Sequence, residues 1–271
     1  DRETSTFFEW DRMHVLNHKG KHFQVEGPLN VPRSPQGQPV IVQAGASENG
    51  RELAARSADV IFGASQSIEI AQAFYADVKS RLAKYGRQPG DLKILPGLSV
   101  TVAPTVEEAQ AKFDELQELI HPDHGLAFLS RRIGHDLTGM DPDIPMPDLP
   151  AVDDVGTRSG QMLELAKREK WTLRQLYQHF AAARGHMLLI GTPSMVVDSM
   201  QEWFENGACD GFNIIPSTFP DEFESFVDLV VPELQRRGLY RKAYEGKTLR
   251  DLLGLRVPES RYAAAGAAAA E

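Results

Sequence analysis

The sequence has very little cysteine, with Cys209 as its single thiol among 271 residues. One cysteine excludes an internal disulfide framework, and a chain without disulfides suits a reducing, cytoplasmic compartment. No cationic residue stands beside Cys209 in the sequence to lower its pKa. We therefore expect this thiol to be buried packing rather than a reactive group.

Basic residues are also scarce relative to acidic ones, with 29 Lys and Arg against 38 Asp and Glu and a net charge of -9. This balance argues against a nucleic-acid partner, which requires a basic face. No apolar run approaches the length needed to span a membrane, so we expect a soluble protein. The first residues, DRETSTFFEW, contain no initiator Met and resemble no signal peptide, which indicates that the sequence starts inside a longer chain.

A convincing metal-binding pattern is missing as well. His121 and His124 could both be ligands, but we expect Pro122 to prevent regular helical placement, and no Cys or Glu lies at a zinc-like spacing. The aspartates between positions 141 and 154 lack the central glycine and terminal glutamate of an EF-hand. We predict no metal site, and a solvated loop at these aspartates.

Short apolar runs alternate with amphipathic segments along most of the chain. We expect four barrel-type strands, at 40–43, 59–63, 93–102 and 211–215, and helices at 67–85, 106–120, 194–206 and 223–237. The alternation breaks after 120 and resumes at 187–190. This pattern predicts an α/β fold with a parallel sheet covered by helices. A closed TIM (β/α)₈ barrel needs eight strands, so the sequence supplies about half of one.

Three segments interrupt or flank the alternation within what we expect to be one barrel domain over 1–271. Residues 1–38 are rich in turn formers and form a connecting arm. Residues 121–190, with helices expected at 157–170 and 172–184, form an insertion that leaves the barrel and returns. Residues 238–271 form a C-terminal arm that ends in an alanine-rich tail.

The most informative stretch is PVIVQAGASENGRELAARSA, residues 39–58. It predicts a buried strand at 40–42, a turn of small residues, and a helix capped by Ser47 with Leu53 on its apolar face. Such a turn leaves backbone N–H groups and the positive end of a helix dipole facing outward, which favours a phosphate. Gly50 would allow close approach of an anion. A simple helix cap remains the alternative, because this Ser-x-x-Gly turn is neither a Walker loop nor a GxGxxG fingerprint.

Two blocks carry a resemblance to a known family: HKGKHFQVEGPLNVPRSPQGQPVIVQAGASENGRELAARSADVIF at 18–62 and RGHMLLIGTPSMVVDSMQEWFENGACDGFNIIP at 184–216. They resemble the large component of two-component flavin monooxygenases of the bacterial-luciferase-like superfamily. The branch is that of nitrilotriacetate monooxygenase component A and dibenzothiophene-sulfone monooxygenase. The resemblance implies a luciferase-like TIM barrel, of which this chain holds the C-terminal part after roughly the fourth β/α unit.

The resemblance also implies a function. An enzyme of this kind uses reduced FMN and O₂ to oxidise a small organic substrate such as an aminopolycarboxylate, a sulfone or an alkane. Its partners would be a separate NAD(P)H:flavin reductase and further copies of itself. We expect activity only together with the N-terminal half. The alternatives are a non-catalytic fragment or interaction module, and an F420-dependent oxidoreductase of the same superfamily.

The resemblance assigns roles to six positions. Ser47 would hold the FMN phosphate, with Ala46 and Gly50 in the same turn. Phe62 would lie near the flavin ring, unless it is a plain core residue. His186 and Ile190 would contact substrate, with a structural histidine as the alternative for His186. No acid, base or nucleophile stands out, because the difficult chemistry would belong to the cofactor.

Overall fold

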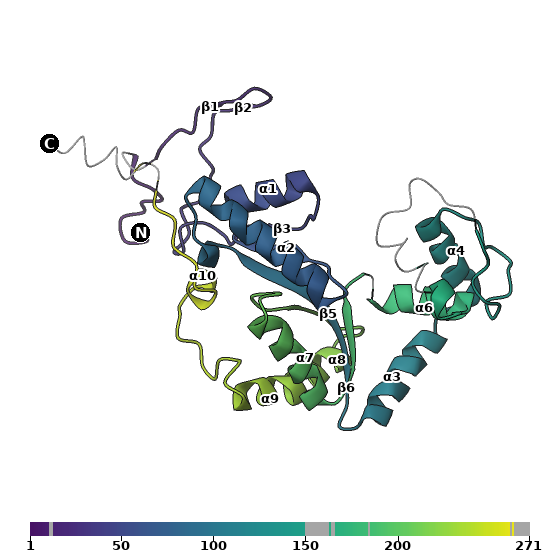
Figure 1. The fold of residues 1–271 in the computed structure, drawn as a ribbon. Coiled ribbons are helices and arrows are strands. Elements are labelled where there is room, and N and C mark those ends of the chain that lie inside the picture. Colours follow the sequence, from purple (N-terminus) through teal and green to yellow (C-terminus); the bar gives the residue numbers. More distant parts are fainter. Residues whose placement is uncertain (11–12, 150–162, 164–165, 184, 261, 263–271) are drawn as a thin grey trace. The chain divides into compact units, whose positions relative to one another are not determined.

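A computed structural model describes residues 1–10, 13–149, 163, 166–183, 185–260 and 262 of the chain (Figure 1). The chain divides into two compact units. The larger is Ile41–Tyr244, and the smaller combines Asp1–Val40 with Glu245–Glu271.

A parallel sheet organises the larger unit (Figure 1). Its strands are β3 (Val42–Gln43), β4 (Val60–Gly63), β5 (Lys93–Val102), β6 (Met187–Gly191) and β7 (Asn213–Ile215). The long strand β5 is central: its first half pairs with β4, its second half with β6, and its middle with β7. The four predicted strands are thus present, and β6, which the count of four omitted, forms where the alternation was expected to resume.

Helices follow most of these strands. They are α1 (Glu48–Ser57), α2 (Ile68–Arg81), α3 (Val106–Glu118), α4 (Pro122–Ile133), α6 (Leu173–Ala183), α7 (Pro193–Glu205), α8 (Asp221–Ser225) and α9 (Val231–Arg236). A π-helical turn joins α8 to α9. The helix expected at 172–184 is confirmed as α6, whereas the one expected at 157–170 lies mainly outside the described residues.

One face of the sheet is covered by helices, through two apolar cores. Leu98, Val100 and Met187 are buried in a core that includes side chains of α7. Ile61 and Ile94 are buried in a second core with residues of α1 and α2. Because successive strand residues point to opposite faces, the intervening residues face away from these helices. They are Phe62, Leu95, Gly97, Ser99, Thr101, Leu188, Ile190 and Ile215.

Cys209 lies in the first of these cores with 2% of its surface exposed. Burial raises the pKa of its thiol to about 12, which keeps it protonated. The expected role as buried packing is confirmed.

The expectation of a buried strand at 40–42 is wrong. Ile41 is 41% exposed and Val42 is 60% exposed. Within the described residues β3 pairs only with β4, so its other edge is open. Leu53, expected on the apolar face of α1, is 46% exposed, and Ala54 and Ala55 are buried instead.

The expectation for Pro122 is also wrong. Pro122 is the first residue of the regular helix α4, with His121 as its N-cap. Proline fits this position because the first helical N–H has no intrahelical acceptor. Helices α4 and α6 pack together through a separate apolar core that contains Leu129, Leu176 and Tyr177.

The smaller unit contains the hairpin of β1 (His18–Lys19) and β2 (Gln24–Val25), and the short helix α10 (Leu249–Leu252). Arg250 is 2% exposed there and donates hydrogen bonds to the carbonyl oxygens of Gln38 and Arg256 at 3.1 and 2.9 Å. These bonds connect the segment before the sheet to the C-terminal arm. In the part of the chain that the structure describes, no helix is long and apolar enough to cross a bilayer.

Candidate functional site

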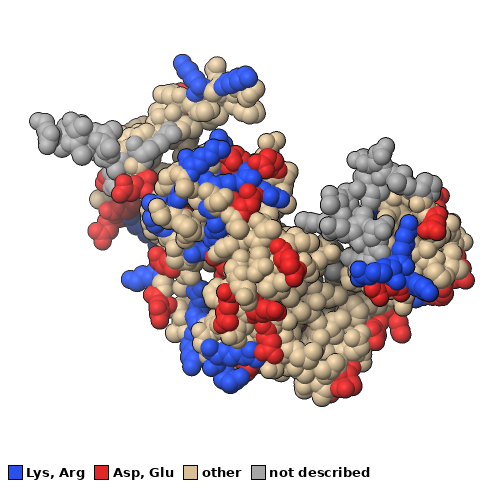
Figure 2. Space-filling model, in the orientation of Figure 1, with Lys and Arg blue, Asp and Glu red and all other residues tan. Residues whose placement is uncertain are grey.

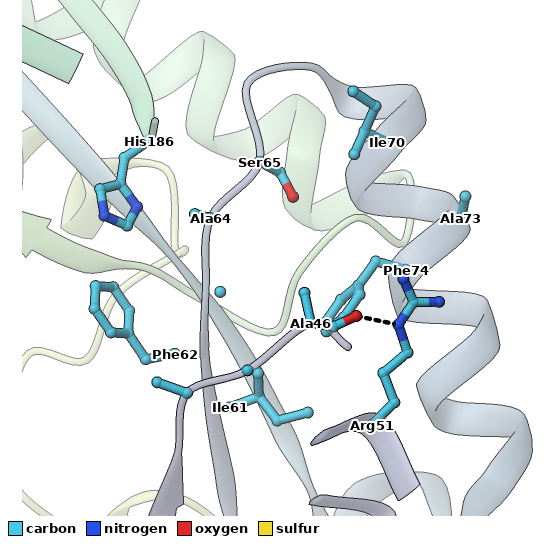
Figure 3. Close-up of a pocket in the computed structure, with 13 residues that line it drawn as sticks. Ala46, Arg51, Ile61, Phe62, Ala64, Ser65, Ile70, Ala73, Phe74 and His186 are labelled. Carbon is cyan, nitrogen blue, oxygen red and sulfur yellow. Dashed lines mark hydrogen bonds between the residues drawn. The ribbon is translucent and has the colours of Figure 1, made fainter. Parts of the chain in front are cut away.

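A cavity of about 550 Å³ opens at the carboxyl ends of β3 and β4 (Figure 3). Barrel enzymes carry their active sites at this end of the strands. Most of its lining is small or apolar. The lining residues are Ala44, Gly45, Ala46, Arg51, Ile61, Phe62, Gly63, Ala64, Ser65, Ile70, Ala73, Phe74 and His186.

The turn after β3 leads directly into the capped start of α1. Ser47 has extended backbone angles, and its Oγ accepts a hydrogen bond from the Gly50 N–H at 3.2 Å. A hydroxyl that accepts in this way keeps its own proton for donation to another group. Among the described residues, the N–H groups of Glu48 and Asn49 have no acceptor. The turn therefore offers three donors at the positive end of a helix of 10 residues.

Arg51 forms the cationic side of the cavity and was not identified from the sequence. Its Nε donates to the Ala46 carbonyl oxygen at 2.9 Å, drawn as a dashed line in Figure 3, and its Nη1 donates to Asp77 Oδ2 at 2.8 Å. The guanidinium carbon lies 5.2 Å from the centre of the Phe74 ring. These contacts hold the guanidinium beside the turn, and at 32% exposure the side chain is still accessible.

An ion-pair network extends from Arg51 across α1 and α2. Asp77 also accepts from Arg81, at 2.9 Å, and Arg81 pairs in turn with Glu48. Hydrogen bonding to Arg81 lowers the pKa of Glu48, the acidic residue in the first turn of α1. Figure 2 shows basic and acidic side chains intermixed over these two helices. Because Arg81 compensates Glu48, the acidic side chain does not cancel the positive field at the start of α1.

On the other side of the cavity two rings lie one above the other. The centres of Phe62 and His186 are 5.2 Å apart and their planes differ by 14°. A Cβ on Gly97 would lie 2.5 Å from His186 Nδ1, so the imidazole lies where a side chain at position 97 would be. The missing side chain at Gly97 is what permits the ring pair.

Only some of the six positions that the family resemblance assigned line this cavity. Ala46, Phe62 and His186 line the cavity. Ser47 and Gly50 are not among the lining residues; they follow Ala46 as the N-cap of α1 and a residue of its first turn. A Cβ on Gly50 would come within 3.1 Å of the Gly45 carbonyl oxygen, which gives that glycine a packing reason of its own. Ile190 pairs with Thr101, further along β5, and does not line this cavity.

Metal ligands are not gathered anywhere in the described ranges, where no group of three or more His, Cys, Asp or Glu side chains could hold an ion. The rings of His121 and His124 are 5.7 Å apart at their centres.

Comparison with known proteins places the chain in a family. Residues 9–210 match the luciferase-like monooxygenase family, and the chain belongs to it. The expected α/β barrel of luciferase-like type is confirmed, and the chain contains part of that barrel.

Among the relatives, nitrilotriacetate monooxygenase component A of Aminobacter aminovorans is 51% identical over 255 residues, covering 93% of this chain and 56% of that protein. N-acetyl-S-(2-succino)cysteine monooxygenase of Bacillus subtilis (strain 168) is 49% identical over 266 residues, covering 97% of this chain and 60% of that protein. The chain thus spans little more than half the length of these relatives.

Solved structures also match nearly all of this chain over little more than half of their own length. DmoA from Hyphomicrobium sulfonivorans is 31% identical with a TM-score of 0.81, covering 98% of this chain and 57% of that one. Riboflavin lyase RcaE, whose structure holds modified FMN and riboflavin, is 29% identical with a TM-score of 0.73, covering 97% of this chain and 58% of that one.

Proposed function

We propose that the complete protein is the large component of a two-component flavin monooxygenase, and that the turn after β3 binds the phosphate of reduced FMN. The observation that carries the proposal is the arrangement of free donors and one guanidinium around a turn of small residues. The N–H groups of Glu48 and Asn49, the hydroxyl of Ser47 and the side chain of Arg51 all belong to this turn or the first turns of α1. Backbone donors combined with a fork of guanidinium donors suit a phosphate dianion.

The rest of the cavity fits a flat ring system. Ala44, Gly45 and Ala46 leave the backbone bare, so a ligand could lie against it, while Phe62 and Phe74 supply apolar walls. Reduced FMN, when bound, supplies the activation of O₂. The contribution of this chain is to anchor the phosphate, support the ring and exclude water with the apolar walls.

His186, which lines the cavity, would hold a polar group of the substrate or cofactor. Its stacking on Phe62 fixes the plane of the imidazole, so its nitrogens have a defined direction. Ile190 would belong to an apolar wall further from this cavity.

The names of the relatives support the choice of reaction and partner. Relatives are named for the oxidation of nitrilotriacetate, dibenzothiophene sulfone and long-chain alkanes, and one is called component A. By analogy the protein would oxidise a small organic molecule, receive reduced flavin from a separate NAD(P)H:flavin reductase, and assemble with further copies of itself.

Anaerobic titration of the complete protein tests the proposal, with reduced FMN and F420 as competing ligands. We expect reduced FMN to bind and F420 to bind far more weakly. With O₂ and a candidate substrate, oxidation should require an added flavin reductase. Preferential F420 binding, or turnover with NADH alone, would contradict the proposal.

A further inference from the structure

A second cavity, of about 240 Å³, lies on the face of the sheet turned away from the helices of the main core. Its floor consists of strand residues that follow one another on this face: Ser99, Thr101, Leu188 and Ile215. Its walls come from α3, with Phe113, Leu116 and Gln117, from Ile120 just after α3, and from α6, with Ala181 and Ala182. Residues distant in sequence thus line one space.

The second cavity adjoins the first. A Cβ on Gly97 would lie 2.5 Å from Nδ1 of His186, which lines the first cavity, and 2.7 Å from Cδ1 of Ile215, which lines the second. One side chain from the lining of each cavity therefore lies against the same glycine. A molecule in the second cavity would be a neighbour of a flavin ring in the first.

The lining of the second cavity contains no charged residue among those described. The lysine on the adjoining helix, Lys112, pairs with Glu222 at 3.5 Å. A carboxylate in this cavity would give up part of its water without gaining a cation from the described residues, which is unfavourable. An uncharged ligand meets no such penalty.

Polar groups are present nevertheless. Gln117 Oε1 is buried and has no hydrogen-bond partner in the described part of the chain. Ser99 and Thr101 are 9% and 3% exposed, and both line the space. A buried acceptor without a donor is unfavourable, so a ligand that donates one hydrogen bond would be stabilised by Gln117.

From these observations we infer that the second cavity binds the substrate, and that the substrate is an uncharged, largely apolar molecule with one hydrogen-bond donor for Gln117. The inference rests on the proposed flavin site and specifies its substrate class. It sets this protein apart from relatives named for nitrilotriacetate and for N-acetyl-S-(2-succino)cysteine, both of which carry several carboxylates, despite identities of 51% and 49%.

Calorimetric titration of the complete protein with octan-1-ol and octanoate tests the charge requirement, because the two probes share a chain length and differ in charge. Nitrilotriacetate serves as a third probe. We expect the alcohol to bind at least about tenfold more tightly than either carboxylate. Equal or tighter binding of octanoate or nitrilotriacetate would overturn the inference.

Three variants locate the binding. Ala182→Phe fills the cavity and should weaken octan-1-ol binding by about tenfold or more, with FMN affinity unchanged. Gln117→Leu keeps the size of the side chain and should weaken the alcohol about tenfold by removing the acceptor. Leu119→Phe, at a site on the end of α3 that is 76% exposed, is the control and should change nothing. If Ala182→Phe lowers the melting temperature, its weaker binding could come from a loss of folding. The octan-1-ol affinity of Gln117→Leu is then the test of the inference.

Failure of the inference and failure of the proposed function give different results. Normal FMN binding with unchanged alcohol affinity in both cavity variants would overturn the inference alone. Alcohol binding that the cavity variants abolish, in a protein that binds no FMN, would contradict the flavin function and leave this cavity as a site for neutral ligands.

Discussion

Two strand–turn–helix units of this chain have helices that start with the same kind of cap but in different surroundings. Ser47 caps α1 after β3, and Thr105 caps α3 after β5, each accepting a hydrogen bond from the N–H three residues later at 3.2 Å. The turn before α1 borders a cavity and has Arg51 beside it. The first turn of α3 instead contains Glu107 and Glu108, of which Glu108 completes a capping box.

The comparison shows that a capped helix start does not make an anion site by itself. At α3 the Glu108 carboxylate accepts from the N-cap N–H, and both glutamates repel a second anion. At α1 the acidic residue is compensated by Arg81, and a guanidinium is held beside the turn. The decisive difference is what the neighbouring helix contributes. Asp77 on α2 fixes the direction of Arg51 beside the turn, whereas the basic residue of α3, Lys112, pairs with Glu222 two turns into its helix.

Removing the guanidinium of Arg51 should have the largest effect on the ability of the turn before α1 to bind a phosphate. Arg51→Gln should weaken FMN binding by about 10- to 100-fold, because hydrogen bonds between charged groups are worth more than neutral ones. Riboflavin, which lacks the phosphate, should bind as before. Fluorescence titration of both ligands measures the ratio, with Arg56→Gln on the exposed side of α1 as the control. An equal loss for both ligands would show that Arg51 only supports the fold.

Gly97→Ala should be the most damaging change between the two cavities. The new Cβ would meet His186 Nδ1 at 2.5 Å and Ile215 Cδ1 at 2.7 Å. We expect a loss of about 1–3 kcal/mol in the free energy of unfolding, because overpacking forces side chains to move. Chemical denaturation measures it, and Gly90→Ala, where a Cβ would have open space, is the matched control. Equal stability of the two variants would be inconsistent with the contacts at Gly97.

Paired cap deletions sharpen the comparison further. Ser47→Ala and Thr105→Ala should each cost about 1 kcal/mol of unfolding free energy, because each removes one capping bond. Only Ser47→Ala should also weaken FMN binding, by several-fold, since only its hydroxyl would reach a phosphate. Thermal unfolding and flavin titration on both variants give the result. A flavin effect of equal size in both variants would remove the distinction between the two turns.

The smallest effect concerns the acid stability of the contact between α1 and the turn that follows α2, residues 82–85. Hydrogen bonds from Lys84 and Tyr85 lower the pKa of Glu52 to about 2. A folded pKa below the ordinary 4.5 means that this interaction stabilises the protein above that value and is lost as pH falls from 4.5 toward about 2. Melting temperatures at neutral and acid pH should therefore converge slightly in Glu52→Gln. A variant whose acid sensitivity matches the parent would contradict this assignment.

The sequence was sufficient to predict the alternation, the capped turn and the buried thiol, because each depends on a local pattern. Arg51 could not be found in this way, since its direction is set by Asp77 and Phe74 on another helix. The only local signal was a basic residue four positions after the cap. Periodicity likewise could not show that Val42 lies on an open edge, because exposure there depends on which strand stands beside it.

The helical segment shows a different reason for error. Pro122 was interpreted as a helix breaker, although the same residue is favourable at the first helical position. Its effect depends on where the helix begins, which the His and Asp residues around it did not reveal. The second cavity was not predicted either, because its floor and walls come from segments as distant as Ser99 and Ile215.

The central claim is that the turn between β3 and α1 anchors the phosphate of a flavin. A crystal structure of the complete protein soaked with FMN tests it most directly. We predict the phosphate within hydrogen-bonding distance of the Ser47 hydroxyl, the N–H groups of Glu48 and Asn49, and the Arg51 guanidinium. A phosphate bound at any other turn, with the one after β3 empty, would contradict the account.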